Sequence, residues 1–265
     1  MNIDLKGKNA FVSGSSKGIG KAVAKALAAL GANVTLVART ETALLQGLID
    51  LSYTAGAEQR HDYLVADYSQ PEKLKTAVER HLLKTNKTYH ILINNTGGPA
   101  SGKITDANEE DFVTAFNHHL LCNHILSRLL VEGMKREQYG RIVNIISTSV
   151  KVPLPNLGVS NTIRGAVANW AKTMANELAL YGITVNNVLP GATQTERLQQ
   201  IIAGKSEKQQ IAMDEVEQHM LAEIPMHRFA KAEEVANAVA FLASPAAAYI
   251  TGINLPVDGG RTGSL

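Results

Sequence analysis

The sequence contains almost no cysteine, few aromatic residues and no long apolar run. The single cysteine, Cys122, excludes a disulfide framework and any metal site built from several cysteines. No uninterrupted apolar segment reaches about 18 residues, so we expect no membrane span. The first residues, Met1 to Lys6, include an acid and lack the long apolar core of a signal peptide. These absences indicate a cytoplasmic protein.

An excess of charge of either sign is missing as well. The 26 basic and 24 acidic residues give a formal net charge of +2 and are interspersed along the chain, which argues against a nucleic acid partner. The length of 265 residues is enough for a large hydrophobic core that needs no disulfide or metal. We therefore expect a protein that acts on a small molecule and has no metal site.

The chain does contain a regular alternation of short apolar runs and helical patterns, and no linker or repeat interrupts it. Such an alternation predicts crossover connections, a parallel sheet and helices on both of its faces, in one α/β domain over residues 1–265. The expected strands are 7–13, 33–38, 63–66, 89–93, 140–146, 183–189 and 253–257. The expected helices cover about 19–30, 41–51, 72–83, 109–137, 163–178 and 232–243.

The segment from about 193 to 224 does not follow this pattern. Between Glu196 and Glu223 it is polar and rich in glutamine, with scattered apolar side chains. We expect a helical insertion with modest packing, which would form a lid over a substrate site.

A glycine-rich turn, GSSKGIG at residues 14–20, lies between the first expected strand and the first expected helix. Glycines there permit positive φ and close approach, and free N–H groups at a helix start attract phosphate. The spacing GxxxGxG differs from the commonest dinucleotide fingerprint, GxGxxG, and alone it is also compatible with a plain tight turn. The strand before it and the helix after it favour nucleotide binding.

Further motifs follow this turn in order along the chain. They are Asp67 after the third apolar run, NNTG at 94–97, NIIS at 144–147, GITVN at 182–186, Pro190-Gly191 with Thr195, FLAS at 241–244 and DGG at 258–260. With these motifs, the chain from about Leu5 to Gly260 resembles a short-chain dehydrogenase/reductase of the classical size class. The resemblance implies a Rossmann-type, doubly wound parallel sheet of seven strands in a three-layer α/β/α arrangement. It also implies a nicotinamide dinucleotide bound at the carboxyl ends of the strands.

The resemblance also implies which residues contact the dinucleotide. Asp67 resembles the residue that meets the adenine, Asn95 the residue whose backbone supports the nucleotide, and Thr195 the residue that contacts the nicotinamide carboxamide. The complete expected set is Gly14, Ser16, Lys17, Gly18, Ile19, Gly20, Arg39, Asp67, Asn95, Gly97, Arg164, Pro190, Gly191 and Thr195.

The end of the second strand favours NADP(H) over NAD(H). A carboxylate there would accept hydrogen bonds from the ribose 2′-hydroxyl and repel a 2′-phosphate, whereas an arginine pairs with that phosphate. Ala38 occupies the expected position of the acid, Arg39 follows it, and Lys17 belongs to the nearby glycine turn. The alternative is that Arg39 is only a solvated residue after a strand.

The catalytic residues of the family are matched only in part. By resemblance, they form an Asn-Ser-Tyr-Lys tetrad in which the tyrosine protonates the carbonyl oxygen as hydride arrives. The serine is Ser147, but Ser160 and Arg164 stand at the tyrosine and lysine positions, and His119 stands at the asparagine position. Lysine follows at the fourth position after none of the tyrosines, which are Tyr53, Tyr63, Tyr68, Tyr89, Tyr139, Tyr181 and Tyr249.

The substituted set suggests a non-standard mechanism. Ser147, Ser160 and Arg164 would hold the substrate oxygen, while His119 or water would supply the proton. An arginine with a pKa above about 12 stays charged and cannot give up a proton, whereas a histidine titrates near about 6.5 when unperturbed and could feed a proton through water. Structural alternatives stay open: His119 is only packed in its helix, and Ser160 caps the helix that follows Gly158.

Functions from different classes also stay open. The first is an NADP(H)-dependent oxidoreductase acting on a carbonyl or alcohol. The second is a catalytically inactive, nucleotide-binding pseudoenzyme with a regulatory or scaffolding role, and the third is a lyase or isomerase that uses the same pocket. Turnover separates the first two, because both bind the cofactor. By resemblance, we expect a homodimer or homotetramer formed through the helices of His119 and Trp170 and through the last strand.

Overall fold

A seven-stranded parallel sheet forms the centre of the computed structural model, which describes residues 1–51 and 58–264. Tyr53 lies outside the described residues. The strand order is β3-β2-β1-β4-β5-β6-β7, which confirms the expected doubly wound sheet. The strands are β1 Asn9–Ser13, β2 Asn33–Ala38, β3 Asp62–Val65, β4 Ile91–Asn94, β5 Gly140–Ile145, β6 Ile183–Pro190 and β7 Asn254–Val257.

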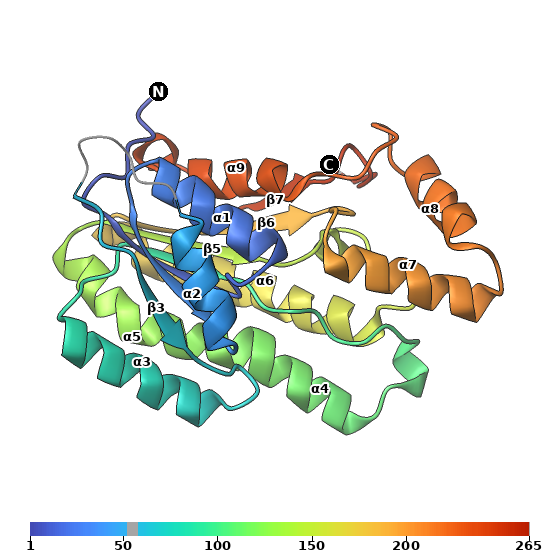
Figure 1. The fold of residues 1–265 in the computed structure, drawn as a ribbon, viewed down its shortest axis with the longest axis horizontal. Helices are drawn as coiled ribbons and strands as arrows, with labels where there is room; N and C mark the ends of the chain where they lie inside the picture. The colour runs from blue at the N-terminus through green and yellow to red at the C-terminus, as the bar shows by residue number, and fades with distance from the viewer. Residues whose placement is uncertain (52–57, 265) are drawn as a thin grey trace.

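Helices cover both faces of the sheet and give three layers (Figure 1). Side chains of α1, α2 and α9 share a core with one face, and those of α3, α5 and α6 share a core with the other. The helices are α1 Gly18–Ala29, α2 Glu41–Ile49, α3 Pro71–Thr85, α4 Glu109–Phe116, α5 Cys122–Arg136, α6 Gly158–Leu178, α7 Glu196–Gln209, α8 Met213–Ala222 and α9 Ala232–Ala243.

The central strands are apolar and buried on both faces, as expected for a parallel sheet between two helical layers. The helix expected over 109–137 is interrupted. A π-helical turn, Asn117–Leu121, joins α4 to α5, and it contains His118 and His119. Such turns insert one residue into a helix and are frequent at functional sites.

A row of asparagines crosses the buried sheet and has no counterpart among the sequence expectations. Asn94, Asn144, Asn187 and Asn254 stand directly opposite one another on four adjacent strands, β4 to β7. Each side-chain amide donates to the next carbonyl oxygen, at 2.9, 2.8 and 2.8 Å. We call this row the asparagine ladder. Its three hydrogen bonds pair amide groups that would otherwise carry a desolvation penalty, while the Asn94 Oδ1 at its end is buried without a partner.

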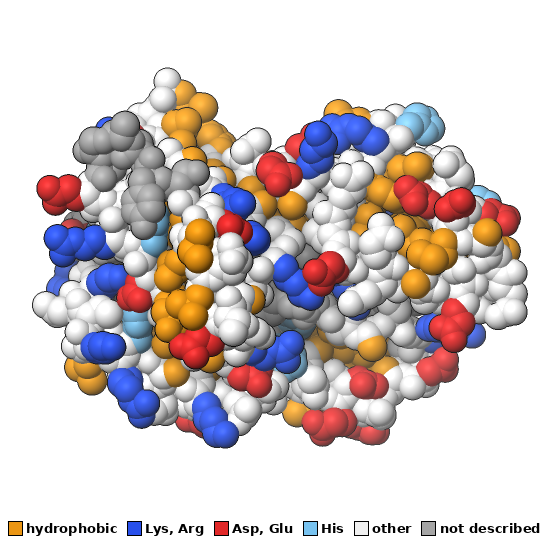
Figure 2. Space-filling model, viewed as in Figure 1, with side chains coloured by type: hydrophobic (Ala, Val, Ile, Leu, Met, Phe, Trp, Pro, Cys, Tyr) orange, Lys and Arg blue, Asp and Glu red, His pale blue; other side chains and the backbone are white. Residues whose placement is uncertain are grey.

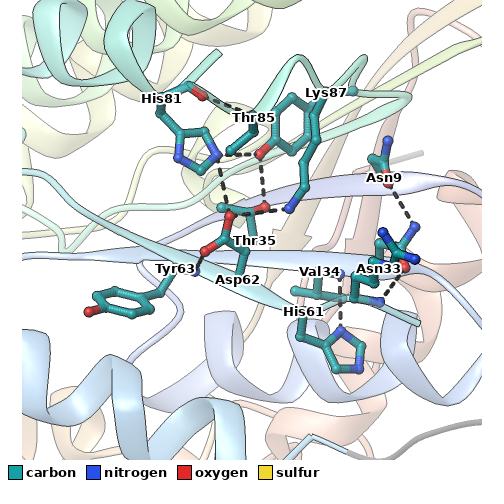
Figure 3. Close-up of polar contacts among 12 residues, drawn as sticks. Asn9, Asn33, Val34, Thr35, His61, Asp62, Tyr63, His81, Thr85 and Lys87 are labelled. Atoms are coloured by element: carbon teal, nitrogen blue, oxygen red, sulfur yellow. Dashed lines mark hydrogen bonds and ion pairs between the residues drawn. The ribbon is translucent and has the colours of Figure 1, made fainter. Parts of the chain in front are cut away.

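A second polar network lies near the amino ends of β2 and β3. The buried Tyr89 hydroxyl is 2.8 Å from Thr35 Oγ1 and 2.8 Å from His81 Nε2, and Lys87 donates to Asp62 at 3.2 Å. Figure 3 shows His81 and Lys87 converging on Asp62. Burial raises the pKa of Tyr89, so its hydroxyl stays protonated. One of the few aromatic residues is thus used in packing, away from the carboxyl ends of the strands.

The insertion expected near 193–224 is helical. It forms α7 and α8, which share a small core of their own with Ile224 and Phe229. In Figure 1 the two helices lie beyond the carboxyl end of β6. Over residues 1–51 and 58–264, no helix has the length and apolar character needed to cross a lipid bilayer.

Candidate active site

Most of the predicted site residues gather where the central strands end. The glycine turn follows β1, Asn95 follows β4, Ser147 follows β5, and Pro190 ends β6. These ends meet at one edge of a parallel sheet, which is where open α/β sheets bind ligands. Figure 2 shows that the molecular surface is hollowed between the body of the sheet and the part formed by α7 and α8.

The glycine turn needs glycine for both conformation and space. Gly14 and Gly18 have φ of 59° and 54°, in the left-handed region that favours glycine. A Cβ on Gly20 would lie 2.1 Å from the Gly14 carbonyl oxygen. The helix α1 begins at Gly18, and its N-cap residue, Lys17, gives it no side-chain hydrogen bond. The first N–H groups of α1 therefore receive no hydrogen bond from the Lys17 side chain.

Asn95 joins β4 to this turn. Its side-chain amide donates to the carbonyl oxygens of Ser13 and Gly14, both at 3.3 Å. The resemblance implied a backbone role toward the nucleotide, and that role stays a prediction. These two side-chain hydrogen bonds hold the glycine turn against the end of β4.

Arg39 and Asp67 lie near each other, in the part of the predicted dinucleotide site that would hold the adenosine. Arg39 is exposed after β2, and Asp67 follows β3. Although partial burial opposes it, hydrogen bonds from Ser69 and Gln70, together with the charge of Arg39, lower the pKa of Asp67. Asp67 is therefore ionised at neutral pH, and it can accept hydrogen bonds from an adenine amino group.

Lys17 has a partner that the sequence did not suggest. Its Nζ lies 2.5 Å from a carboxylate oxygen of Glu196, the first residue of α7, and both side chains are about two-thirds exposed. A phosphate bound by Lys17 would have to compete with this carboxylate. The ion pair connects the glycine turn to the insertion.

The start of α7 also contacts the site at two further points. Thr195 is the N-cap of α7 and accepts a hydrogen bond from the Leu198 N–H at 3.4 Å. Its methyl group lies 3.3 Å from where a Cβ of Gly18 would stand, so Thr195 rests against the glycine turn. Arg197 donates to the Pro99 carbonyl oxygen at 2.7 Å. The beginning of α7 is thus fixed over the loops that follow β1 and β4.

The predicted catalytic residues come from three elements that pack together. Ser147 precedes the short 3₁₀ turn Thr148–Val150, His119 lies in the π-helical turn, and α6 packs on both turns. Ser160 and Arg164 are one turn apart on α6, so they share a face. Ser147 and Ser160 are partly exposed, whereas His119 and Arg164 are buried.

Ser160 does not cap α6. The helix begins at Gly158 and its N-cap is Leu157, so Ser160 is the third helical residue. The capping alternative is therefore wrong, because the turn that serine was expected to cap starts two residues earlier. Its role toward a substrate stays a prediction.

Arg164 is 7% exposed, and its Nη1 donates to the Ile145 carbonyl oxygen at 3.1 Å. Burial lowers the pKa of Arg164 to about 10, below the expected value, yet the guanidinium is still charged at neutral pH. This hydrogen bond holds Arg164 beside the end of β5. The contact with the cofactor stays a prediction.

His119 is neutral in the folded protein. Burial, followed by the positive charges of Arg164 and His118, lowers the pKa of His119 to about 2. Its Nδ1 lies 2.6 Å from the Thr96 hydroxyl. The pKa of His119 therefore lies well below that of an unperturbed histidine, because the residue is 1% exposed and lies near a permanent cation. His119 can relay a proton as neutral imidazole, but it holds no extra proton at neutral pH.

Some residues that contact the candidate site were missed by sequence reasoning. Thr96, the partner of His119, is the third residue of the NNTG motif at 94–97, and the motif alone gave that threonine no role. Glu196 and Arg197 gave no signal, because charged residues at a helix start are common on solvated surfaces. Cys122 is buried, and burial raises the pKa of its thiol to about 12. Within the described ranges, no cluster of three or more His, Cys, Asp or Glu residues is arranged to hold a metal ion.

Comparison with known proteins gives matches over almost the whole chain. A family model described as enoyl-(acyl carrier protein) reductase matches residues 14–262. The chain is 34% identical over 267 residues to the 3-oxoacyl-[acyl-carrier-protein] reductase FabG of Vibrio cholerae, covering 97% of this chain and 98% of that protein. It is 30% identical over 258 residues to the NADPH-dependent reductase BacG of Bacillus subtilis, covering 97% and 99%. The structure of L-sorbose reductase from Gluconobacter frateurii, complexed with NADPH and L-sorbose, matches with a TM-score of 0.91, 30% identity and full coverage of both chains.

Proposed function

Because this chain belongs to the short-chain dehydrogenase/reductase family, we propose that it is an NADP(H)-dependent oxidoreductase acting on a carbonyl compound or an alcohol. Similar proteins described as NADPH-dependent or complexed with NADPH support the choice of cofactor. The observation in this chain that carries it is the exposed Arg39, directly after the alanine that ends β2, with a second cation, Lys17, in the neighbouring glycine turn.

The residues present fit a dinucleotide. The turn at 14–20 leaves no room for side chains at Gly14 and Gly20, which is expected where a pyrophosphate approaches backbone closely. Thr195 rests against this turn, and Asp67 offers an ionised carboxylate near Arg39. When bound, the nicotinamide would supply or accept a hydride. The set that would hold it is Gly14, Ser16, Lys17, Gly18, Ile19, Gly20, Arg39, Asp67, Asn95, Gly97, Arg164, Pro190, Gly191 and Thr195.

The protein's own contribution to the reaction would be positioning and charge. The hydroxyls of Ser147 and Ser160 would donate hydrogen bonds to the substrate oxygen, and the Arg164 guanidinium would stabilise negative charge on it. His119, neutral and hydrogen-bonded to Thr96, would relay a proton from water. The helices α7 and α8 would close over the substrate as a lid.

The cofactor proposal is tested by the affinities of NADPH and NADH, measured by the fluorescence of the reduced nicotinamide. We expect Arg39→Ala to weaken NADPH binding about tenfold while changing NADH binding little, because an arginine and phosphate form a charge-assisted contact. The matched control is Arg80→Ala, which removes another exposed arginine on α3. Equal losses for NADPH and NADH would contradict the assignment of Arg39 to the 2′-phosphate.

The alternative function is a nucleotide-binding pseudoenzyme. The observation that favours it is that His119 is neutral and serine stands at the position of the family's proton donor. NADPH oxidation over a broad panel of carbonyl substrates separates the two functions. Binding without turnover across that panel would support the pseudoenzyme.

The assembly stays a prediction. We expect a homodimer or homotetramer through α5, α6 and β7, and light scattering of the purified protein measures its mass. A monomer at micromolar concentration would contradict this expectation.

A further inference from the structure

Arg197, the second residue of α7, is a partly buried cation beside the candidate active site. Its Nη2 donates to the Pro99 carbonyl oxygen at 2.7 Å, and among the described residues it makes no other hydrogen bond and no ion pair. The adjacent carboxylate, on Glu196, is held by Lys17. Because a guanidinium has five N–H donors, Arg197 keeps most of its donors for a ligand.

The neighbours of Arg197 place it at the candidate active site. Thr195, two residues earlier, rests against the glycine turn. Pro99, which accepts the hydrogen bond from Arg197, lies three residues after Thr96, the partner of His119. The guanidinium therefore bridges the start of α7 and the loop after β4, next to the hollow between the sheet and the insertion that Figure 2 shows.

The loop beside the guanidinium leaves room for a ligand. Gly97 and Gly98 are both exposed. Within the described chain, a Cβ on Gly97 would have no atom beyond its chain neighbours within 4 Å, and a Cβ on Gly98 would meet only Arg197 Nη2, at 4.0 Å. The space next to the Arg197 donors is therefore accessible from outside the protein.

Two other arginines show how this protein satisfies a guanidinium by itself. Arg141 donates to three carbonyl oxygens, and Arg228 forms two hydrogen bonds with the carboxylate of Glu234, at 2.6 and 2.7 Å. The second pair shows the arrangement that a ligand carboxylate would adopt on Arg197, because guanidinium and carboxylate match each other in two parallel hydrogen bonds.

The charge at this point favours a carboxylate over a phosphate. A phosphate monoester carries about two negative charges at neutral pH, whereas Arg197 supplies one positive charge. Lys17 already pairs with Glu196 and belongs to the proposed cofactor site. A single carboxylate is therefore the anion whose charge Arg197 balances.

Resting on the proposed oxidoreductase function, we propose that Arg197 binds a carboxylate of the substrate, so that the protein acts on oxo acids or on the corresponding hydroxy acids. Arg197 selects and orients the substrate and exchanges no atoms with it. In the reduction, the carbonyl carbon gains a hydride, its oxygen gains a proton, and NADPH is oxidised to NADP⁺. The carboxylate is unchanged, and the reverse reaction oxidises the hydroxy acid.

The substrate class is tested by NADPH oxidation with 2-oxobutanoate, 3-oxobutanoate and 4-oxopentanoate, each beside its methyl ester. We expect kcat/KM for the preferred acid to exceed that for its ester by about 10- to 100-fold, because the ester cannot form the charge-assisted pair. Arg197→Gln should remove this preference by raising KM for the acid, with kcat and the affinity for NADPH unchanged. The control Lys208→Gln, which removes an exposed cation from the same helix, should keep the preference.

A second pair of variants tests the space beside Arg197. Gly98→Asp places a carboxylate where it can pair with the guanidinium, because the Cβ would lie 4.0 Å from Nη2. It should raise KM for the acid about tenfold and leave KM for the ester unchanged. Gly98→Asn adds an uncharged side chain of the same size and should change neither value. Circular dichroism checks the folding of each variant.

The outcomes separate this inference from the proposed function. Equal turnover of acid and ester by the wild type would overturn the carboxylate inference and leave the proposed function standing. Equal losses for acid and ester in Arg197→Gln, or a loss of NADPH affinity, would also overturn it, because Arg197 would then act on the fold or on the cofactor. If NADPH binds and neither the acids, their esters nor a broad panel of neutral ketones is reduced, the oxidoreductase function fails together with the inference.

Discussion

The Gly20→Ala substitution is a sharp test of the glycine turn. The added Cβ would lie 2.1 Å from the Gly14 carbonyl oxygen, 2.7 Å from the Gly14 carbonyl carbon and 2.6 Å from the Asn95 side-chain amide. Two of these atoms belong to the backbone, so either the turn or the start of α1 has to move by roughly 1 Å to restore ordinary contact. Overpacking of this kind costs about 1–3 kcal/mol, which exceeds the gain of about 1 kcal/mol that alanine brings within a helix.

Urea unfolding followed by circular dichroism measures this loss, and NADPH fluorescence measures the accompanying loss of affinity. The matched control is Gly204→Ala in α7, where nothing lies within 4 Å of the added Cβ. That substitution should raise the free energy of unfolding by up to about 1 kcal/mol, or leave it unchanged. If both variants change stability in the same direction and by the same amount, the steric reasoning about the turn is wrong.

Three further predictions concern charge and buried polarity. Lowering the pH from 7 to 5 should destabilise the wild type by about 2 kcal/mol more than it destabilises the His119→Gln variant. The reason is that the unfolded chain protonates this imidazole below pH 6.5, while the folded protein does not. Equal losses of stability in urea titrations of the two proteins would contradict a neutral His119. Glu196→Gln should tighten NADPH binding up to about fivefold, because it removes the carboxylate that competes with the phosphate for Lys17, and an exposed ion pair of this kind competes only weakly. Fluorescence titration should show no such gain for NADH, and none for NADPH in the control Glu207→Gln. Asn144→Leu should lower the free energy of unfolding by roughly 2–4 kcal/mol, because it leaves buried amide groups of its two ladder neighbours unpaired; a loss under about 1 kcal/mol in urea unfolding would show that water replaces the ladder.

Most of the fold followed from local signals. The strands of a parallel sheet buried on both faces are nearly continuous apolar runs, and the observed strands begin and end within two residues of those runs. The glycine turn was recognisable because positive φ and close contact both require glycine. The π-helical turn at 117–121 was not, because one inserted residue hardly changes an apolar pattern that α4 and α5 continue on either side.

The candidate site was predictable in position and less so in chemistry. Counting along the motifs selected Ser147, Ser160 and Arg164, and the structure places them on adjoining elements. The ionisation of His119 depends on burial and on a cation that is distant in the sequence, so neither composition nor spacing could reveal it. The asparagine ladder was missed for a related reason, because an asparagine within an apolar run does not show which residue stands opposite it.

The burial of Arg164 sets stability against activity at a single position. An arginine that the protein does not neutralise itself costs the ligand-free fold on the order of several kcal/mol in lost hydration, and an apolar residue of similar volume would avoid most of that cost. Selection for thermal resistance alone would therefore favour leucine or methionine here, even as it removed the charge on which the proposed reaction depends. Persistence of arginine at this position in laboratory evolution would thus report selection for the reaction, and its replacement would report selection for the fold alone.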